Sequence, residues 1–189
     1  KSPWTLELEG IELTDIHDLK VGGMHVENEG EIRGAFTLKP GQFLEVKPST
    51  FQIKKGRLNL GREKPKPVLA EMEAFHTVTI HPTDLTVTHG DQIFDTMDID
   101  QKMNAKILSA EFLALALKDY RPLLFGESEG TLKTQLVIRK GVLQSTSGMD
   151  AQLLKTQLVL SGAEIEGSGS LVWEIEKEAK MTFKLDRAI

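Results

Sequence analysis

The stretch from Met97 to Ile107 alternates apolar and polar side chains, and this pattern determines what the chain can fold into. One face of the alternation carries Met97, Ile99, Met103, Ala105 and Ile107, with Gln101 as its polar exception. An amphipathic helix would need apolar spacings of three and four, whereas a period of two is that of a β-strand. At about 3.3 Å per residue the strand would span roughly 36 Å, which is longer than usual.

The same alternation recurs along the chain, at Trp4 to Leu8, Phe51 to Ile53, Val78 to Ile80, Leu85 to Val87, Leu171 to Ile175 and Met181 to Leu185. Between these segments stand turn-forming residues at Lys39-Pro40-Gly41, Lys55-Gly56, His89-Gly90-Asp91, Lys140-Gly141 and Ser161-Gly162. Glycine supplies the positive φ of tight hairpins, so we expect antiparallel connections. The sequence therefore predicts a mostly-β fold, either one long antiparallel sheet or a β-sandwich.

One short helix is expected near residues 110–118. The Ser109 hydroxyl can accept a backbone N–H at its start, and such a cap contributes about 1 kcal/mol. Ala110, Leu113 and Leu117 then form an apolar stripe, and Pro122 discourages continuation. Because so short a helix is marginal alone, its stripe should pack against the sheet.

The chain also repeats itself. Residues 132–137 and 154–159 share the hexamer Leu-Lys-Thr-Gln-Leu-Val, and residues 51–58 parallel residues 136–143. Repeated strand, basic-glycine turn and strand units suggest an elongated sheet, although amphipathic hairpins can also look alike by composition alone. Residues 62–67, with two prolines and four charges, are the best candidate for a linker. We expect one β-rich domain over residues 1–189, cut from a larger protein, with a soft boundary at residues 62–67.

Composition excludes several function classes. The chain has no cysteine, which removes disulfides, thiolate metal sites and cysteine nucleophiles. Its formal net charge is −5 with both signs interleaved, so it lacks the basic field that nucleic acids require. The longest apolar run, Phe112 to Leu117, is far shorter than the ~20 residues of a membrane-spanning helix.

No catalytic or metal-binding signature is found. Gly56 to Glu63 has the glycine spacing of a phosphate loop, but acidic Glu63 stands where a magnesium-binding hydroxyl is needed. The five histidines lack metal-ligand spacing, although His76, His81 and His89 could converge across a hairpin. The aspartates around Asp98 and Asp100 lack the glycine and glutamate of a calcium loop. We therefore expect a protein that is not an enzyme and that holds no metal or cofactor.

Several segments together resemble the AsmA-like and TamB-like proteins of the bacterial envelope. They share glycine-ended amphipathic strands and short Gly-x-Leu returns. These segments are residues 4–13, 30–36, 40–46, 56–61, 104–107 and 130–143.

The resemblance implies a long curled sheet, a β-taco or groove, whose apolar inner face lets phospholipids cross between two membranes. It implies no catalytic residues. It also implies a periplasmic or cell-envelope location, in a parent protein anchored outside this segment. The residues expected to line the groove are Met97, Ile99, Met103, Ala105, Ile107, Leu113 and Leu117. Expected partners are phospholipid and not nucleic acid, and the chain should be a monomer, or a dimer that arises only because excision exposes its strand edges.

The alternative function is a protein–protein interaction or cell-surface module built as a β-sandwich. A sandwich has a closed core, whereas a groove leaves an apolar strip larger than a monomer usually exposes. The shape of the sheet therefore distinguishes the two.

Overall fold

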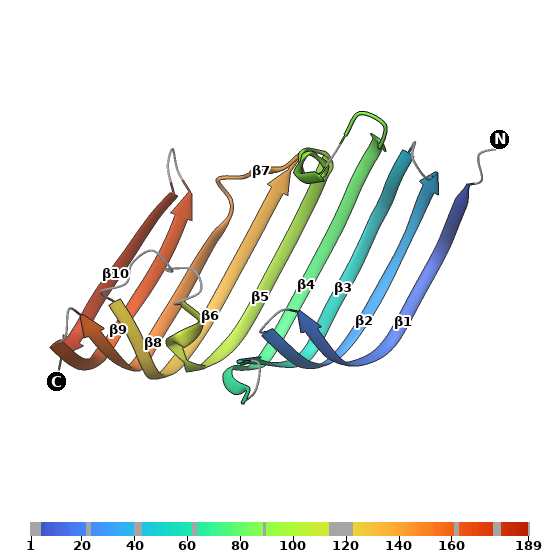
Figure 1. The fold of residues 1–189 in the computed structure, drawn as a ribbon. Helices are drawn as coiled ribbons and strands as arrows, with labels where there is room; N and C mark the ends of the chain where they lie inside the picture. The colour runs from blue at the N-terminus through green and yellow to red at the C-terminus, as the bar shows by residue number, and fades with distance from the viewer. Residues whose placement is uncertain are drawn as a thin grey trace.

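A single antiparallel sheet makes up almost the whole molecule (Figure 1). The computed structural model describes residues 5–21, 24–39, 43–61, 64–88, 90–113, 123–160, 163–175 and 179–188. The strands are β1 (Leu6–Val21), β2 (Met24–Lys39), β3 (Phe43–Leu60), β4 (Lys66–Asp84), β5 (Met97–Ser109), β6 (Leu123–Arg139), β7 (Val142–Leu143), β8 (Gly148–Leu160), β9 (Ala163–Ile175) and β10 (Ala179–Ala188). Two 3-10 turns complete the described elements, η1 (Gly90–Thr96) and η2 (Ala110–Phe112).

The strands follow one another as a meander. Their order in the sheet is that of the chain from β1 to β10, and only the two-residue β7 lies off this path, paired with β6. The predicted antiparallel, mostly-β fold is confirmed, and the strand expected over residues 97–107 is β5. The described residues form one open sheet, so the sandwich alternative is wrong.

The register places the apolar positions of successive strands on the same face. Ile107 of β5 lies opposite Leu69 of β4 and Gly130 of β6. Leu132 of β6 lies opposite Ala105 on one side and Ala151 on the other. Since directly paired residues point to the same side of a sheet, one face of the whole sheet is apolar and the other is polar.

A row of β-bulges crosses the sheet and bends it. The register shifts between Leu13 and Ile16, Glu27 and Gly30, Ile53 and Gly56, Ala70 and Glu73, and Leu153 and Thr156. Bulges bend strands and increase their twist. Each strand that crosses the row is divided into a long arm and a short arm. In β3, for example, the long arm is residues 43–53 and the short arm is residues 56–60. The lower ends of the strands curl over in Figure 1.

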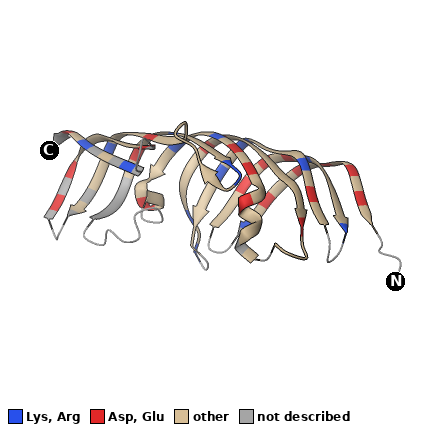
Figure 2. Ribbon diagram, turned by 90° about the horizontal axis from the view of Figure 1, so that it is seen from above, with Lys and Arg blue, Asp and Glu red and all other residues tan. Residues whose placement is uncertain are grey.

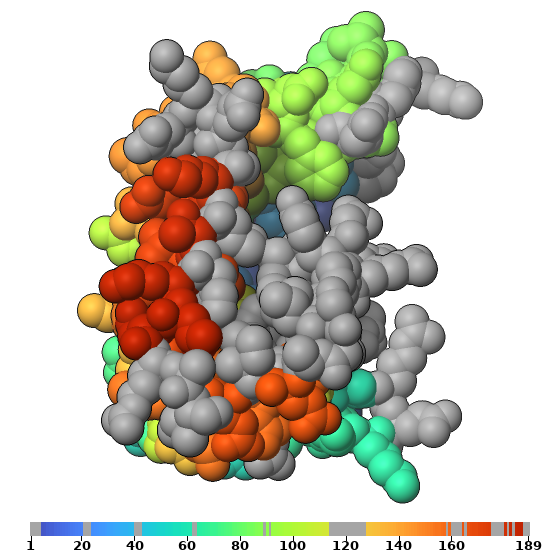
Figure 3. Space-filling view, turned by 90° about the vertical axis from the view of Figure 1, so that its left-hand side faces the viewer, coloured from blue at the N-terminus to red at the C-terminus, as the bar shows by residue number. Residues whose placement is uncertain are grey.

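Viewed from the β10 edge, the coloured segments at the top and at the bottom of the molecule extend to the same side of β9 and β10, with the η1 region at the top (Figure 3). Viewed from above, the sheet is an arch with η1 and η2 on its inner side (Figure 2). The curled form that the family resemblance implies is therefore present.

Glycines on the inner side make the bend possible. A Cβ on Gly56 would lie 2.7 Å from Cγ2 of Ile53 and 2.8 Å from Cε of Met72. A Cβ on Gly130 would overlap the carbonyl oxygen of Gln152. These glycines provide space where neighbouring strands approach each other at the bulges, rather than a left-handed backbone.

This role corrects one predicted turn. Lys55-Gly56 is not a hairpin but lies inside β3, next to the bulge. Lys140-Gly141 does form the predicted turn, with φ of 47° and 73°. Both pairs have the same sequence, so only the surroundings distinguish a glycine used for its φ from one used for its small size.

The expected helix is described only at its start. The Ser109 hydroxyl accepts the backbone N–H of Glu111 at 3.2 Å, which confirms the predicted cap. A 3-10 turn follows over Ala110–Phe112, and residues 114–122 lie outside the described residues. Ala110 and Leu113 are buried, as a stripe packed on the sheet should be.

The charged segment at residues 62–67 connects neighbouring strands. β3 ends at Leu60 and β4 begins at Lys66, and the two pair along their length in the same sheet.

The two copies of the repeated hexamer lie in different environments. Leu132 is buried, whereas Leu154 is 75% exposed because it falls in the β8 bulge.

We predict that Gly130→Ala lowers the free energy of unfolding by about 1–3 kcal/mol, because the new methyl group cannot fit beside the Gln152 carbonyl. Urea denaturation measures the change. The matched control is Gly148→Ala, where a Cβ would meet only the Trp173 carbonyl oxygen, at 3.0 Å. Equal destabilisation by both substitutions would show that the bend does not depend on the inner glycine.

Candidate functional site

The concave face of the sheet is the main candidate site, because it collects the apolar side chains of nearly every strand. A single-layer sheet has no second sheet to cover this face. It buries a core only where its own curl brings the two arms and η2 together. The buried apolar residues are Ile53, Val68, Leu69, Met72, Ala74, Ala105, Ile107, Ala110, Leu113, Leu132, Ala151, Leu153 and Leu171. They come from β3 to β9, so the core occupies the middle and C-terminal part of the bend.

Among the described residues, the N-terminal end of the same face remains exposed. We define the β1–β2 strip as Leu6, Leu8, Leu13, Leu19 and Met24, which are 37–52% exposed. The register places these side chains on the apolar face, with Leu8 opposite Phe36 and Leu13 opposite Ile32. Grouped apolar exposure of this kind marks a binding surface, whereas scattered exposed residues need no explanation.

The predicted groove residues all lie on the concave side where they are described. Met97, Ile99 and Met103 are half-buried on β5. Ala105, Ile107 and Leu113 belong to the closed core. Leu117 lies outside the described residues. Gln101, the polar exception, is on the same face and pairs with His76 and Leu136.

The exposed strip was not identified from the sequence. Leu6 and Leu8 show the same alternation as the buried strands, so the pattern alone does not tell an open surface from a core. Which end of the apolar face stays uncovered depends on where η2 packs, and η2 contacts β4 and β6, far from β1.

His76 is a partly buried titratable group on the concave face. Its ring centroid lies 5.6 Å from that of Phe51, on the concave face. Partial burial lowers the pKa of His76, because desolvation disfavours the imidazolium. Burial therefore favours the neutral ring on this apolar surface. His81 instead lies at the end of the long arm, and His89 is outside the described residues.

The two aspartates of β5 have structural partners at that end. One carboxylate oxygen of Asp98 accepts the backbone N–H of Lys140 at 2.8 Å, and the other is 3.0 Å from Nε2 of His81. These hydrogen bonds hold the pKa of Asp98 below its usual value. Asp100 pairs with Arg139 at 2.7 Å. The carboxylates fasten the turn after β6 to β5, so neither is left free as a catalytic pair.

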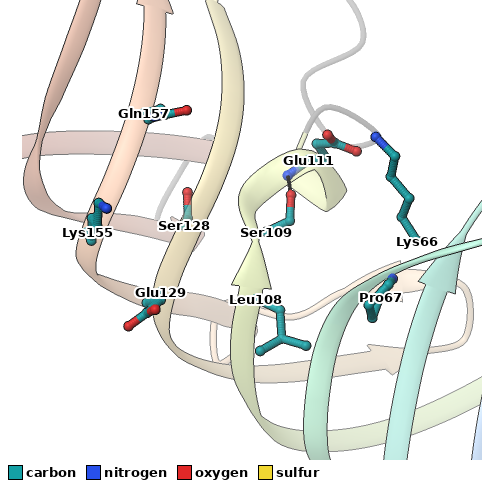
Figure 4. A pocket seen from close by; sticks show the side chains of 9 residues that line it. All are labelled: Lys66, Pro67, Leu108, Ser109, Glu111, Ser128, Glu129, Lys155 and Gln157. Carbon is teal, nitrogen blue, oxygen red and sulfur yellow. Dashed lines mark hydrogen bonds between the residues drawn. The ribbon is translucent and has the colours of Figure 1, made fainter.

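A polar pocket of about 330 Å³ opens where β5 stops (Figure 4). Beyond Ser109 no β5 backbone bridges the short arms of β4 and β6, which leaves a notch in the wall. Its lining carries both charge signs, with Lys66 and Glu111 on one side and Glu129 and Lys155 on the other. Such a mixture selects neither an anion nor a cation.

Other kinds of site are not found among the described residues. They contain no cluster of three histidine, aspartate or glutamate side chains that could hold a metal ion. They also contain no helix long and apolar enough to cross a bilayer. Positive and negative residues are interspersed over the middle of the sheet (Figure 2).

Comparisons of the chain with protein-family models, with curated proteins and with solved structures gave no match. The geometry of the concave face is therefore the basis for a functional proposal.

We predict that His76 makes the protein less stable in mild acid. Its pKa is lower in the folded state, so stability is constant above the unfolded value of about 6.5 and falls as the pH drops below it. His76→Phe removes this contribution, so unfolding free energies of the variant should fall less between pH 7 and pH 5. His17→Gln, at an exposed position on β1, is the control. Identical pH profiles for wild type and His76→Phe would contradict the prediction.

Proposed function

We propose that the concave face binds the acyl chains of lipids, and that the chain is a non-catalytic groove segment of a bacterial cell-envelope protein. In this role it would contribute to lipid transport between membranes, or to outer-membrane assembly, from a periplasmic location. The observation that carries the proposal is the β1–β2 strip, an exposed apolar surface continuous with the core of the same face.

The dimensions of the sheet suit an acyl chain. The open part of the face follows β1, whose 16 residues at about 3.3 Å each run roughly 53 Å around the bend. The acyl chains of one leaflet extend over about half of a ~30 Å hydrocarbon core. One chain can therefore lie along the β1–β2 strip with its whole length against protein.

The chemistry of the face also fits a lipid. Its exposed members are aliphatic, and burial of each CH₂ group contributes about 0.8 kcal/mol without any need for a specific geometry. Burial lowers the pKa of His76 and so disfavours a charge beside the tails. Salt-bridged groups such as Glu31 with Lys54, by contrast, keep the outer face hydrated.

The test is native mass spectrometry of the protein purified from a bacterial host, with organic extraction of bound lipid. We expect phospholipid to copurify. The double variant Leu8→Asp with Leu13→Asp should lose at least ten-fold of it, because two carboxylates would then lie in the path of the tails. Both positions are exposed, so circular dichroism should report a folded sheet.

The matched control is Val87→Asp with Val142→Asp. These valines are 70% and 63% exposed but lie in the turn after β4 and on β7, away from the strip. The control should retain lipid. Lipid-free wild-type protein, or equal loss from both double variants, would refute binding on the strip and leave a protein partner as the occupant of this face.

A further inference from the structure

We propose that a second copy of this chain adds to the sheet, with β10 of one copy pairing in parallel with β1 of the next. The proposal concerns the edges of the sheet and does not depend on lipid binding. It rests on three features of β1 and β10: their unpaired backbones, their opposite charges and the match of their bends.

Both end strands offer backbone groups for pairing. β1 pairs with β2 and β10 pairs with β9, so each has one edge without a strand beside it among the described residues. Neither β1 nor β10 contains a proline, which would remove a donor from the edge. Unpaired strand edges are templates for another chain.

The two edges carry opposite charge. β1 holds five acidic residues and one lysine, a formal charge of −4. β10 holds two lysines, one arginine and one aspartate, a formal charge of +2. Pairing β1 with β1, or β10 with β10, would bring like charges together, whereas pairing β1 with β10 brings opposite charges together. Charge therefore favours head-to-tail addition.

The register of the charges matches across this junction. Glu7 and Glu12 of β1 lie opposite Thr37 and Arg33, which are four residues apart on β2, because the shift between Leu8 and Ile11 absorbs one residue. In β10, Lys180 and Lys184 are also four positions apart.

The bulges of β1 and β10 would also lie at the same level across this junction. Both Glu12 and Lys184 are followed by a leucine on the apolar face, Leu13 and Leu185, and the bulge comes next in each strand. These leucines are 52% and 36% exposed, and they would meet at the junction.

The direction of the strands determines the geometry. The path has nine antiparallel strands, so β1 and β10 run the same way and their pairing is parallel. A parallel pair is slightly weaker than an antiparallel one, which leaves a larger part of the association to charge and to the leucine contact. Since both long arms end at the bend, the concave face of one copy would continue into that of the next.

The experiment is sedimentation velocity of the full chain across concentration and salt. We expect assemblies that grow with concentration and weaken by at least ten-fold in apparent affinity between 50 mM and 500 mM salt, because exposed charges are screened. The proposal would be overturned by a monodisperse monomer at 100 µM and low salt. It would also be overturned by a closed dimer whose association does not change with salt concentration.

Two charge-reversed variants test the pairing itself. Lys180→Glu with Lys184→Glu makes both edges acidic, and Glu7→Lys with Glu12→Lys brings the formal charge of β1 from −4 to 0, so that lysines face lysines at the two matched positions. Each variant alone should associate less than wild type, and an equimolar mixture should recover association, because each β1–β10 contact between the two variants then pairs lysine with glutamate at the matched positions. No recovery on mixing would exclude head-to-tail pairing, and full association of either variant alone would do the same.

Discussion

The structure depends on how one sheet can bury an apolar face with no second layer to cover it. Side chains of alternating character put a continuous apolar surface on one side of every strand, and leaving all of it in water would forfeit about 25 cal/mol per Å². Most folds solve this by packing a sheet or helices on that surface. Here the sheet curls, and its own short arms, together with η2, cover the middle and C-terminal part.

The curl requires a bend at the same level in each strand, and two local devices produce it. Bulges add length to the outer side, as at Ile53 and Gly56 in β3. Glycines remove bulk from the inner side, as at Gly130. The cost appears in the backbone, because Asp15 in the β1 bulge and Glu71 in the β4 bulge have positive φ. The shape of the groove is thus set by the placement of a few residues, while the strands themselves follow from simple alternation.

This division explains what the sequence could predict. The β5 strand and the cap at Ser109 depend on local pattern, and both are confirmed. Lys55-Gly56 depends on Met72 and Ile53 across the bend, so its assignment as a turn was wrong. Local pattern likewise could not distinguish Leu132 from Leu154, which have the same position in identical hexamers. Leu132 is buried and Leu154 is exposed because Leu154 falls in a bulge. For the site, the predicted β5 residues lie on the concave face, but local pattern could not show that its open part is formed by β1 and β2.

The most direct test of the account is an accessibility scan along β1. The chain has no cysteine, so single cysteines at Leu6, Leu8 and Leu13, and at Glu7 and Glu12 on the opposite face, give unique spin-label sites. Collision with a water-soluble nickel complex is then measured with and without phospholipid vesicles. The account predicts that lipid shields the leucine positions and leaves the glutamate positions accessible, with a period of two. Equal accessibility on both faces in the presence of lipid would contradict it.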